Sequence, residues 1–228
     1  REGRGALAGP IRLTAPMSFG IRALGAPLAD FASLHPEVTL DVTLSDDQCD
    51  IVAEGYDLAL RIAALPDSSL LSRTVAPIAL LVVASPGYLA AHGTPRHPLD
   101  LGLHRLMGYG HRREVRPLRF AREGETAVVM PGGPLFANNG DIIVPMLLAG
   151  QGLAMLPEFI VADELSAGTL VPVLTEWALP DVRLQIVMPP SRRRPARVDA
   201  LVEHLAAALK ASCSGRAEPK SVRPLRHS

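Results

Sequence analysis

The chain has 228 residues, 48% of them hydrophobic, so it can bury a substantial core and is not a disordered chain. Lys plus Arg and Asp plus Glu both number 23, and the formal net charge is zero, which excludes the basic surplus typical of a nucleic-acid-binding chain. The two cysteines, Cys49 and Cys213, lie far apart and indicate neither a zinc site nor a disulfide framework.

The N-terminal residues lack the apolar region of a signal peptide, and no run of apolar residues is long enough to span a bilayer. We therefore expect a cytoplasmic protein that does not associate with a membrane. No cluster of residues indicates a bound metal or a cofactor, and we expect neither.

Strands and helices alternate in the first part of the chain. Residues 11–15 form an apolar run typical of a strand, and an amphipathic helix follows as far as residue 35. Residues 38–44 alternate between apolar and polar side chains, which predicts a strand with one buried face. A short helix over 49–54 and a strand over 58–62 come next. This order is typical of half of a doubly wound sheet, and so of an α/β fold with largely parallel sheets.

The second part of the chain is less regular. Residues 78–84 form a continuous apolar run, which predicts a fully buried strand. Residues 93–125 are rich in Pro, Arg and His and show no clear periodicity. The remaining periodicity predicts helices over 86–92, 141–150 and 198–209, and strands over 153–156, 170–173 and 182–188.

Two strand-to-helix junctions are the strongest pointers to function. Residues 14–20 and 137–141 each end an apolar run with small polar residues and then open an amphipathic run. Each junction should present unpaired backbone amides at a helix N-terminus. If the fold brings the two junctions together, the space between them is a cleft for a small molecule.

Several short motifs in a fixed order give the chain a family resemblance. Between residues 9 and 209 it resembles the effector-binding domain of LysR-type transcriptional regulators. The motifs are Ala15-Pro16-Met17-Ser18-Phe19-Gly20, Leu44-Ser45-Asp46, Asp50 to Ile62, Ala84-Ser85-Pro86-Gly87-Tyr88-Leu89, Asn138-Asn139-Gly140-Asp141 and Gly150-Gln151-Gly152-Leu153.

The resemblance implies a periplasmic-binding-protein-like fold of type II, with two α/β lobes joined by two crossover strands. Lobe one is then residues 9–76 plus 178–209, and lobe two is residues 77–177. Residues 1–8 are expected to be a remnant of a linker, and residues 211–228 a disordered tail.

The resemblance also implies a function. The domain would bind a small effector such as an organic acid or an amino acid, form a homodimer or homotetramer, and reach DNA only through a helix-turn-helix domain that this chain lacks. We do not expect an enzyme, because GxSxG, HExxH and Walker motifs are absent. The alternative is a free-standing solute-binding protein, which shares the lobed fold and the cleft.

The candidate effector contacts lie at the two junctions and near them. Ser18 resembles the position whose hydroxyl contacts effectors in family members, but it could also be a plain N-cap. Asn138, Asn139 and Asp141 could instead form an Asn-Gly turn with an Asp cap. The full set is Ala15, Pro16, Met17, Ser18, Asp46, Asp47, Arg61, Ile62, Tyr109, Asn138, Asn139, Pro157 and Phe159.

The charged candidates have structural alternatives. Arg61 ends a strand and could bind a carboxylate through two nitrogens, or it could pair with Asp46 or Asp57. Asp46 and Asp47 could instead cap the helix expected over 49–54. Family members commonly carry Arg at the place of Asp47, so this edge of the cleft is more acidic here.

The candidates from the second lobe also have two interpretations. Tyr109 and His111 could face the cleft, although a histidine beside two arginines is commonly solvated surface. Pro157 and Phe159 could form a wall of the pocket or simply pack in the core. Leu118 stands where many family members carry Trp.

Overall fold

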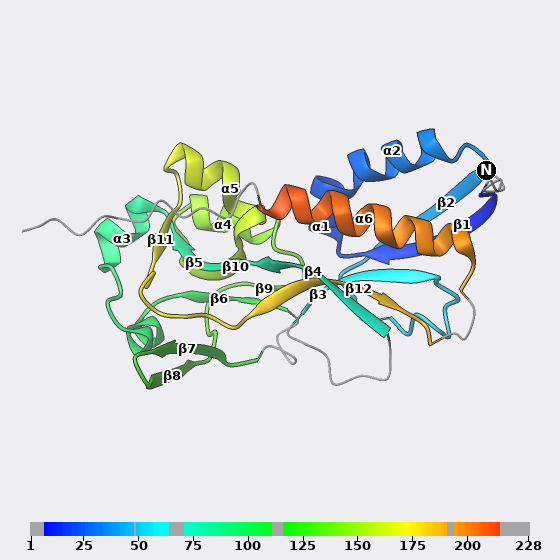
Figure 1. The fold of residues 1–228 in the computed structure, drawn as a ribbon. Coiled ribbons are helices and arrows are strands. Elements are labelled where there is room, and N and C mark those ends of the chain that lie inside the picture. Colours follow the sequence, from blue (N-terminus) through cyan, green and yellow to red (C-terminus); the bar gives the residue numbers. More distant parts are fainter. Residues whose placement is uncertain (1–6, 48, 64–70, 111–115, 191–193, 215–228) are drawn as a thin grey trace, which may run out of the picture.

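The computed structural model describes residues 7–47, 49–63, 71–110, 116–190 and 194–214. Two lobes lie side by side, and each is built on a five-stranded sheet (Figure 1). The predictions for residues 1–6 and 215–228 lie outside the described residues.

The first sheet has the strand order β2-β1-β3-β12-β4. The strands are β1 (Gly9–Ala15), β2 (Val38–Leu44), β3 (Leu58–Ala63), β4 (Leu71–Ile78) and β12 (Val182–Met188). β1 runs parallel to β2 and β3, whereas β12 is antiparallel to β3 and β4. The sheet is therefore mixed, and the prediction of largely parallel pairing holds only for its N-terminal strands.

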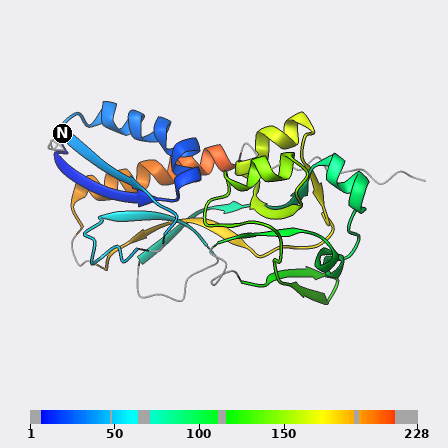
Figure 2. The same ribbon diagram turned by 180° about the vertical axis from the view of Figure 1, so that it is seen from behind.

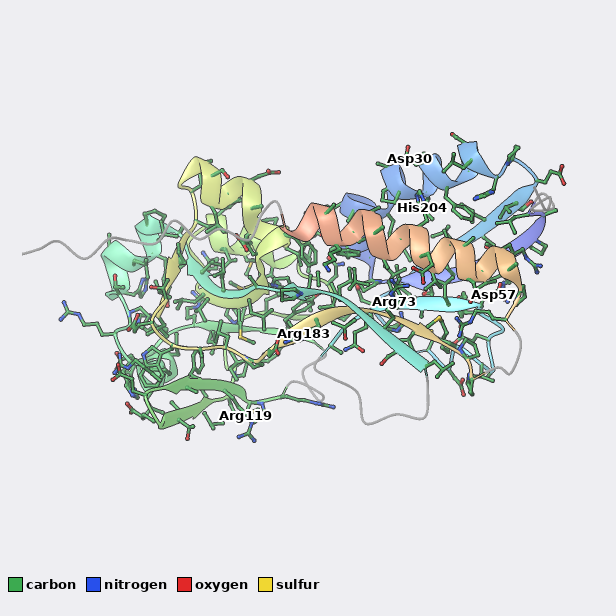
Figure 3. All side chains as sticks on the ribbon, viewed as in Figure 1. Asp30, Asp57, Arg73, Arg119, Arg183 and His204 are labelled. Atoms are coloured by element: carbon green, nitrogen blue, oxygen red, sulfur yellow. The ribbon has the colours of Figure 1, made fainter. Side chains whose placement is uncertain are left out.

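Two long helices cover one face of the first sheet, α2 (Gly25–Leu34) and α6 (Ala196–Ser214) (Figures 1 and 2). The core forms because α6 places Val198, Leu201 and Leu205, all with 0% exposure, against the apolar strands. His204 lies between the two helices, where its Nε2 is 2.9 Å from the carbonyl oxygen of Pro27 (Figure 3).

The second sheet has the order β11-β5-β10-β6-β9. Its strands are β5 (Leu80–Ala84), β6 (Leu106–Tyr109), β9 (Phe136–Ala137), β10 (Leu153–Pro157) and β11 (Val171–Val173). Helices α4 (Ile143–Leu148) and α5 (Glu158–Ala167) lie on one side of it, and the hairpin of β7 (Leu118–Arg122) and β8 (Glu125–Val129) lies on the other (Figure 1). Helix α3 (Pro86–His92) and the 3-10 helix η2 (Pro98–Leu103) complete this lobe.

The chain crosses between the lobes twice. β4 ends at Ile78 in the first sheet and β5 begins at Leu80 in the second, so the buried strand expected over 78–84 is in fact split at Ala79. The return crossing lies between β11 and β12. Periodicity could not reveal the split, because both halves are apolar and only their sheets differ.

Residues 51–55 form turns, so the helix expected over 49–54 is wrong. The Asp50 carboxylate accepts the N–H groups of Val52 and Ala53 at 3.0 and 3.1 Å, a local bonding pattern that competes with helix formation. The segment then ends at Gly55, whose φ is +70°. A segment this short would form too few helical hydrogen bonds to offset the conformational entropy lost when a helix is nucleated.

Other elements differ from the prediction at their ends or were not predicted. Helix α6 continues to Ser214, past the expected start of a tail at residue 211. Helix α1 (Met17–Phe19) and a π-helical segment, η1 (Gly20–Leu24), precede α2, so the single helix expected as far as residue 35 is divided into three segments. Helix α5 and the strands between 93 and 129 escaped prediction because they are short or lack a clear apolar period.

Candidate functional site

The two predicted junctions meet. β1 ends at Ala15 before α1, and β9 ends at Ala137 before α4, so both chain segments leave their sheets at the boundary between the lobes. The Ser18 hydroxyl donates a hydrogen bond to Asp141 at 2.5 Å, and the Asn139 side-chain amide donates to the Ser18 oxygen at 3.1 Å. This contact confirms that the fold brings residues 14–20 and 137–141 together.

Two carboxylates that follow β2 take part in the same contact. Asp46 accepts the backbone N–H of Met17 at 2.9 Å and the side-chain amide of Asn139 at 2.7 Å. Asp47 accepts the Asn138 amide in a longer bond of 3.4 Å. Asp46 therefore accepts the free backbone N–H at the start of α1 and also links the two lobes through Asn139. The prediction that Asp46 and Asp47 cap a helix over 49–54 is wrong, because residues 51–55 form turns.

Ser18 and Asp141 do not cap their own helices. The N-cap of α1 is Pro16 and that of α4 is Ile142, and neither makes a side-chain capping bond. Ser18 is only 2% exposed, and its hydroxyl is used entirely across the lobe boundary. The Asn139 oxygen accepts the N–H of Asp141 at 2.9 Å, so the Asn-Gly turn is confirmed while the Asp cap is wrong.

Arg22 completes the contact between the lobes by forming an ion pair with Asp141. Burial by itself would raise the pKa of Asp141, but the hydrogen bonds from Arg22 and Ser18 outweigh it and hold this pKa below its usual value. The same bond raises the pKa of Arg22. Both groups stay charged at neutral pH. We call the set Ser18, Arg22, Asp46, Asp47, Asn138, Asn139 and Asp141 the interlobe network.

The lowered pKa of Asp141 predicts a specific pH dependence. Its ion pair stabilises the folded chain fully above the pKa of an unfolded Asp, about 4, and this contribution is lost as the pH falls through the lower folded-state pKa. The difference in unfolding free energy between the wild type and Asp141→Asn, about 1 kcal/mol for so exposed a pair, should stay constant from neutral pH to about pH 5 and shrink below pH 4. Urea titrations across this range measure it. A difference that already shrinks near pH 6 would contradict the assignment.

An aromatic pair joins the lobes beside the network. Phe19 of α1 and Phe159 of α5 form an edge-to-face pair with ring centroids 5.6 Å apart and an interplanar angle of 81°. Phe159 packs against the cores of both lobes. Of its two interpretations, packing is therefore the one that the structure supports.

A pocket of about 210 Å³ opens between the two sheets. Strands β3 and β12 of the first sheet and β5, β6 and β10 of the second contribute to its walls. Its lining is mostly apolar, as expected of a site for a small organic molecule. The lining residues are Ile62, Leu80, Met107, Tyr109, Arg116, Leu118, Pro131, Met155, Pro157 and Val182.

Tyr109 lies where the pocket approaches the interlobe network. The residue is 40% exposed overall, but burial around its hydroxyl and then the charges of Asp46 and Asp141 raise the pKa of Tyr109 to about 12. The phenol therefore remains neutral at physiological pH and keeps its proton for donation to a hydrogen-bond acceptor.

The structure separates the candidate residues into three groups. Ile62, Tyr109 and Pro157 line the pocket. Ser18, Asp46, Asp47, Asn138 and Asn139 belong to the contact between the lobes, and Met17 supports it from within the first lobe by donating its backbone N–H to Asp46. Ala15, Pro16, Arg61 and Phe159 neither line the pocket nor contribute side chains to the network. His111 lies outside the described residues.

Arg61 points away from the pocket because neighbouring residues of a strand face opposite sides of the sheet. The Ile62 side chain faces the pocket, whereas the Arg61 guanidinium on the other face of the sheet donates a hydrogen bond to Cys49 Sγ at 2.7 Å. Asp57 instead accepts the backbone N–H of Arg12 at 2.9 Å. Within the described part of the chain no carboxylate forms an ion pair with Arg61, so the expected pairing with Asp46 or Asp57 is wrong.

Sequence reasoning missed most of the apolar lining. Met107 and Tyr109 alternate along β6, and Met155 and Pro157 alternate along β10, so each pair faces the same side of the second sheet. This two-residue period was the available signal. It could not be used without knowing which face of the sheet meets the other lobe.

Of the helices in the described ranges, none is at once long and apolar enough to cross a membrane. In the same part of the chain no three His, Cys, Asp or Glu side chains are grouped to hold a metal ion.

The sequence is similar to those of curated regulators. The HTH-type transcriptional regulator PtxR of Pseudomonas aeruginosa is 35% identical over 207 residues, which cover 90% of this chain and 66% of PtxR. An uncharacterized HTH-type transcriptional regulator of Haemophilus influenzae is 31% identical over 195 residues, or 86% of this chain and 68% of that protein. The chain thus spans about two thirds of the length of these relatives.

Solved structures show the same fold. A full-length variant of AphB has a TM-score of 0.78 and 26% identity, with 90% of this chain and 70% of that chain covered. The regulatory domain of AphB in Vibrio vulnificus has a TM-score of 0.69 and 26% identity, with 89% and 99% covered. The likeness confirms the type II periplasmic-binding-protein-like fold, with two α/β lobes and two crossovers.

A family model described as the LysR substrate binding domain matches residues 4–210, nearly the whole of the described structure. Together with the fold and the regulators that share the sequence, this match confirms the expected family. The chain belongs to the LysR substrate-binding domain family and is an effector-binding domain of the LysR-type transcriptional regulators.

Proposed function

We propose that this chain senses a small effector in the pocket between its lobes, as the regulatory part of a DNA-binding transcriptional regulator. The observation that carries the proposal is the lining of the pocket, which combines Ile62 and Val182 from the first sheet with Met107 and Met155 from the second. A molecule in this position contacts both lobes at once. Its affinity therefore depends on how the lobes are placed relative to each other.

The interlobe network stabilises one placement of the two lobes, and an effector that favours a different placement has to compete with it. Ser18, Asp46, Asn139 and Asp141 bond the lobes to each other close to the pocket. We propose that an effector shifts the balance between this arrangement and another one. Contacts that differ between two lobe arrangements are what a ligand needs in order to act as a signal.

The boundaries of the lobes are also part of the proposal. We assign residues 9–76 and 178–209 to lobe one and residues 77–177 to lobe two, and the strand order of the two sheets supports this division. In the whole protein, DNA is bound through a helix-turn-helix domain and the subunits form a homodimer or homotetramer in the cytoplasm. The names of the curated relatives, HTH-type transcriptional regulators, support this assignment over a free-standing solute-binding protein or an enzyme.

Methionine methyl groups provide the test. Met107 and Met155 line the pocket, whereas Met188 is 5% exposed in the core of the first lobe. In protein labelled with ¹³C at the methionine methyls, metabolites that raise the melting temperature should shift the NMR signals of Met107 and Met155 in a saturable way and leave that of Met188 almost unchanged. If every stabilising metabolite leaves both pocket methyls unmoved, the effector site lies elsewhere.

A further inference from the structure

The chemistry of the pocket wall indicates which class of effector fits. Of the described residues that line the pocket, Tyr109 and Arg116 carry polar side-chain groups, and the others are aliphatic, Met or Pro. The wall thus offers one permanent positive charge, one phenol and a large apolar surface. Each of these features selects for a different part of a ligand.

Among the described residues that line the pocket, Arg116 is the only one with a charged side chain. Within the described ranges it forms no ion pair and no side-chain hydrogen bond, whereas Arg22 and Arg183 are both paired with carboxylates. Arg116 is an exposed residue at the rim of the apolar lining, and a guanidinium in such a place can bind a carboxylate through two parallel N–H···O bonds. The described part of the lining therefore offers one position for a negative charge.

The interlobe network cannot supply a second such position. The Ser18 hydroxyl and the Asn139 amide already donate to Asp141 and Asp46, the chain's own carboxylates. Asp46 and Asp141 also act electrostatically on Tyr109, on the side of the pocket that approaches the network. These carboxylates would repel a second negative charge on the ligand. A neutral oxygen or nitrogen atom of the ligand could instead accept a hydrogen bond from the Tyr109 hydroxyl.

We infer that the effector is a monocarboxylic acid with an apolar body. Its carboxylate binds Arg116, and its body packs between Ile62 and Val182 of the first sheet and Met107 and Met155 of the second. The inference rests on the proposed function, because it names the class of ligand for the same pocket. It excludes dicarboxylates, amines and neutral amides as the preferred ligands.

The experiment compares matched small probes in the full chain. Hexanoate and phenylacetate are the acids, hexanamide and phenylacetamide are the neutral amides of the same shape, and adipate adds a second carboxylate. Titrations followed through the methyl signals of Met107 and Met155 give each dissociation constant. Each acid should bind about tenfold more tightly than its amide, equivalent to about 1.4 kcal/mol, and adipate should bind more weakly than hexanoate.

Two arginine variants complete the test. Arg116→Gln removes the charge from the pocket, and Arg119→Gln is the matched control, since Arg119 is an exposed residue of β7 that points away from the lobe (Figure 3). Arg116→Gln should weaken the acids about tenfold and leave the amides unchanged, whereas Arg119→Gln should change neither. Neither substitution alters a buried contact, so both variants should fold.

The outcomes separate this inference from the proposed function. If amides bind as tightly as acids, or if the two arginine variants bind the acids equally well, the inference is overturned while the response of Met107 and Met155 still supports an effector pocket. If no probe moves either methyl signal, the inference is again overturned. The proposed function fails only if the metabolite search also leaves both methyls unmoved.

Discussion

Gly152→Ala should lower the free energy of unfolding by about 3 kcal/mol or more. Gly152 has a φ of +151°, and a Cβ built there would lie 2.0 Å from the carbonyl oxygen of Arg105. That oxygen cannot move aside, because it accepts the N–H of Leu153 at 3.0 Å where β10 begins beside β6. The added methyl group therefore has to push the two strands apart. Urea denaturation measures the loss.

Gly150→Ala is the matched control two residues earlier. Gly150 also has a positive φ, +68°, but its nearest atom would be the Ser85 hydroxyl at 3.8 Å, an ordinary contact. The substitution should cost about 1 kcal/mol, the usual penalty for a left-handed residue with a side chain. Equal losses for the two variants would show that backbone conformation dominates and that the close approach to Arg105 does not.

Ser18→Ala should lower the free energy of unfolding by about 2 kcal/mol and the melting temperature by about 4 to 8 °C. The hydroxyl is 2% exposed and makes two bonds between the lobes, one to Asp141 and one from Asn139. Without it, the partly exposed carboxylate of Asp141 and side-chain amide of Asn139 each lose a hydrogen bond. One such bond contributes about 1 kcal/mol, and more where a partner is charged, so the two bonds together contribute about 2 kcal/mol. Thermal melts and urea titrations should report the same loss.

Ser33→Ala serves as the control for a serine on a helix. The Ser33 hydroxyl is exposed and donates only to the carbonyl oxygen of Ala29 one turn earlier, at 2.9 Å. We expect a change within about 0.5 kcal/mol. If Ser18→Ala is equally neutral, the network does not hold the lobes together, and the proposed competition between effector and network loses its support.

The sequence predicted the candidate site well at the level of segments but not at the level of side chains. The pattern marks residues 14–20 and 137–141 as two junctions that would enclose a cleft if they meet, and Ser18 does contact Asn139. The prediction that the hydroxyl caps its helix is wrong, because it bonds to Asp141 across the boundary; that it contacts an effector stays a prediction. A side-chain hydroxyl can accept many partners, and only the relative position of the lobes selects one.

Arg61 and Asp46 illustrate why the charged residues were harder to place. Both lie near the ends of first-lobe strands, and the sequence leaves each with more than one candidate role: a carboxylate ligand, Asp46 or Asp57 as the partner of Arg61, and an effector contact or a helix cap for Asp46. The direction in which Arg61 points depends on which face of β3 meets the other lobe. Asp46 bonds to Met17 because parallel pairing of β1 and β2 places their carboxyl ends side by side.

Local sequence alone determined the helices and strands with a strong period, such as α6 and β2, and the ordered motifs determined the family. These features depend on neighbours along the chain, which periodicity and spacing record directly. Tertiary structure alone decided that the run over 78–84 divides between two sheets, that Arg116 and Met155 share a pocket, and that Asp141 meets Ser18. These contacts join residues distant in sequence, and they exist only once the two sheets have packed their cores and fixed the direction of each side chain.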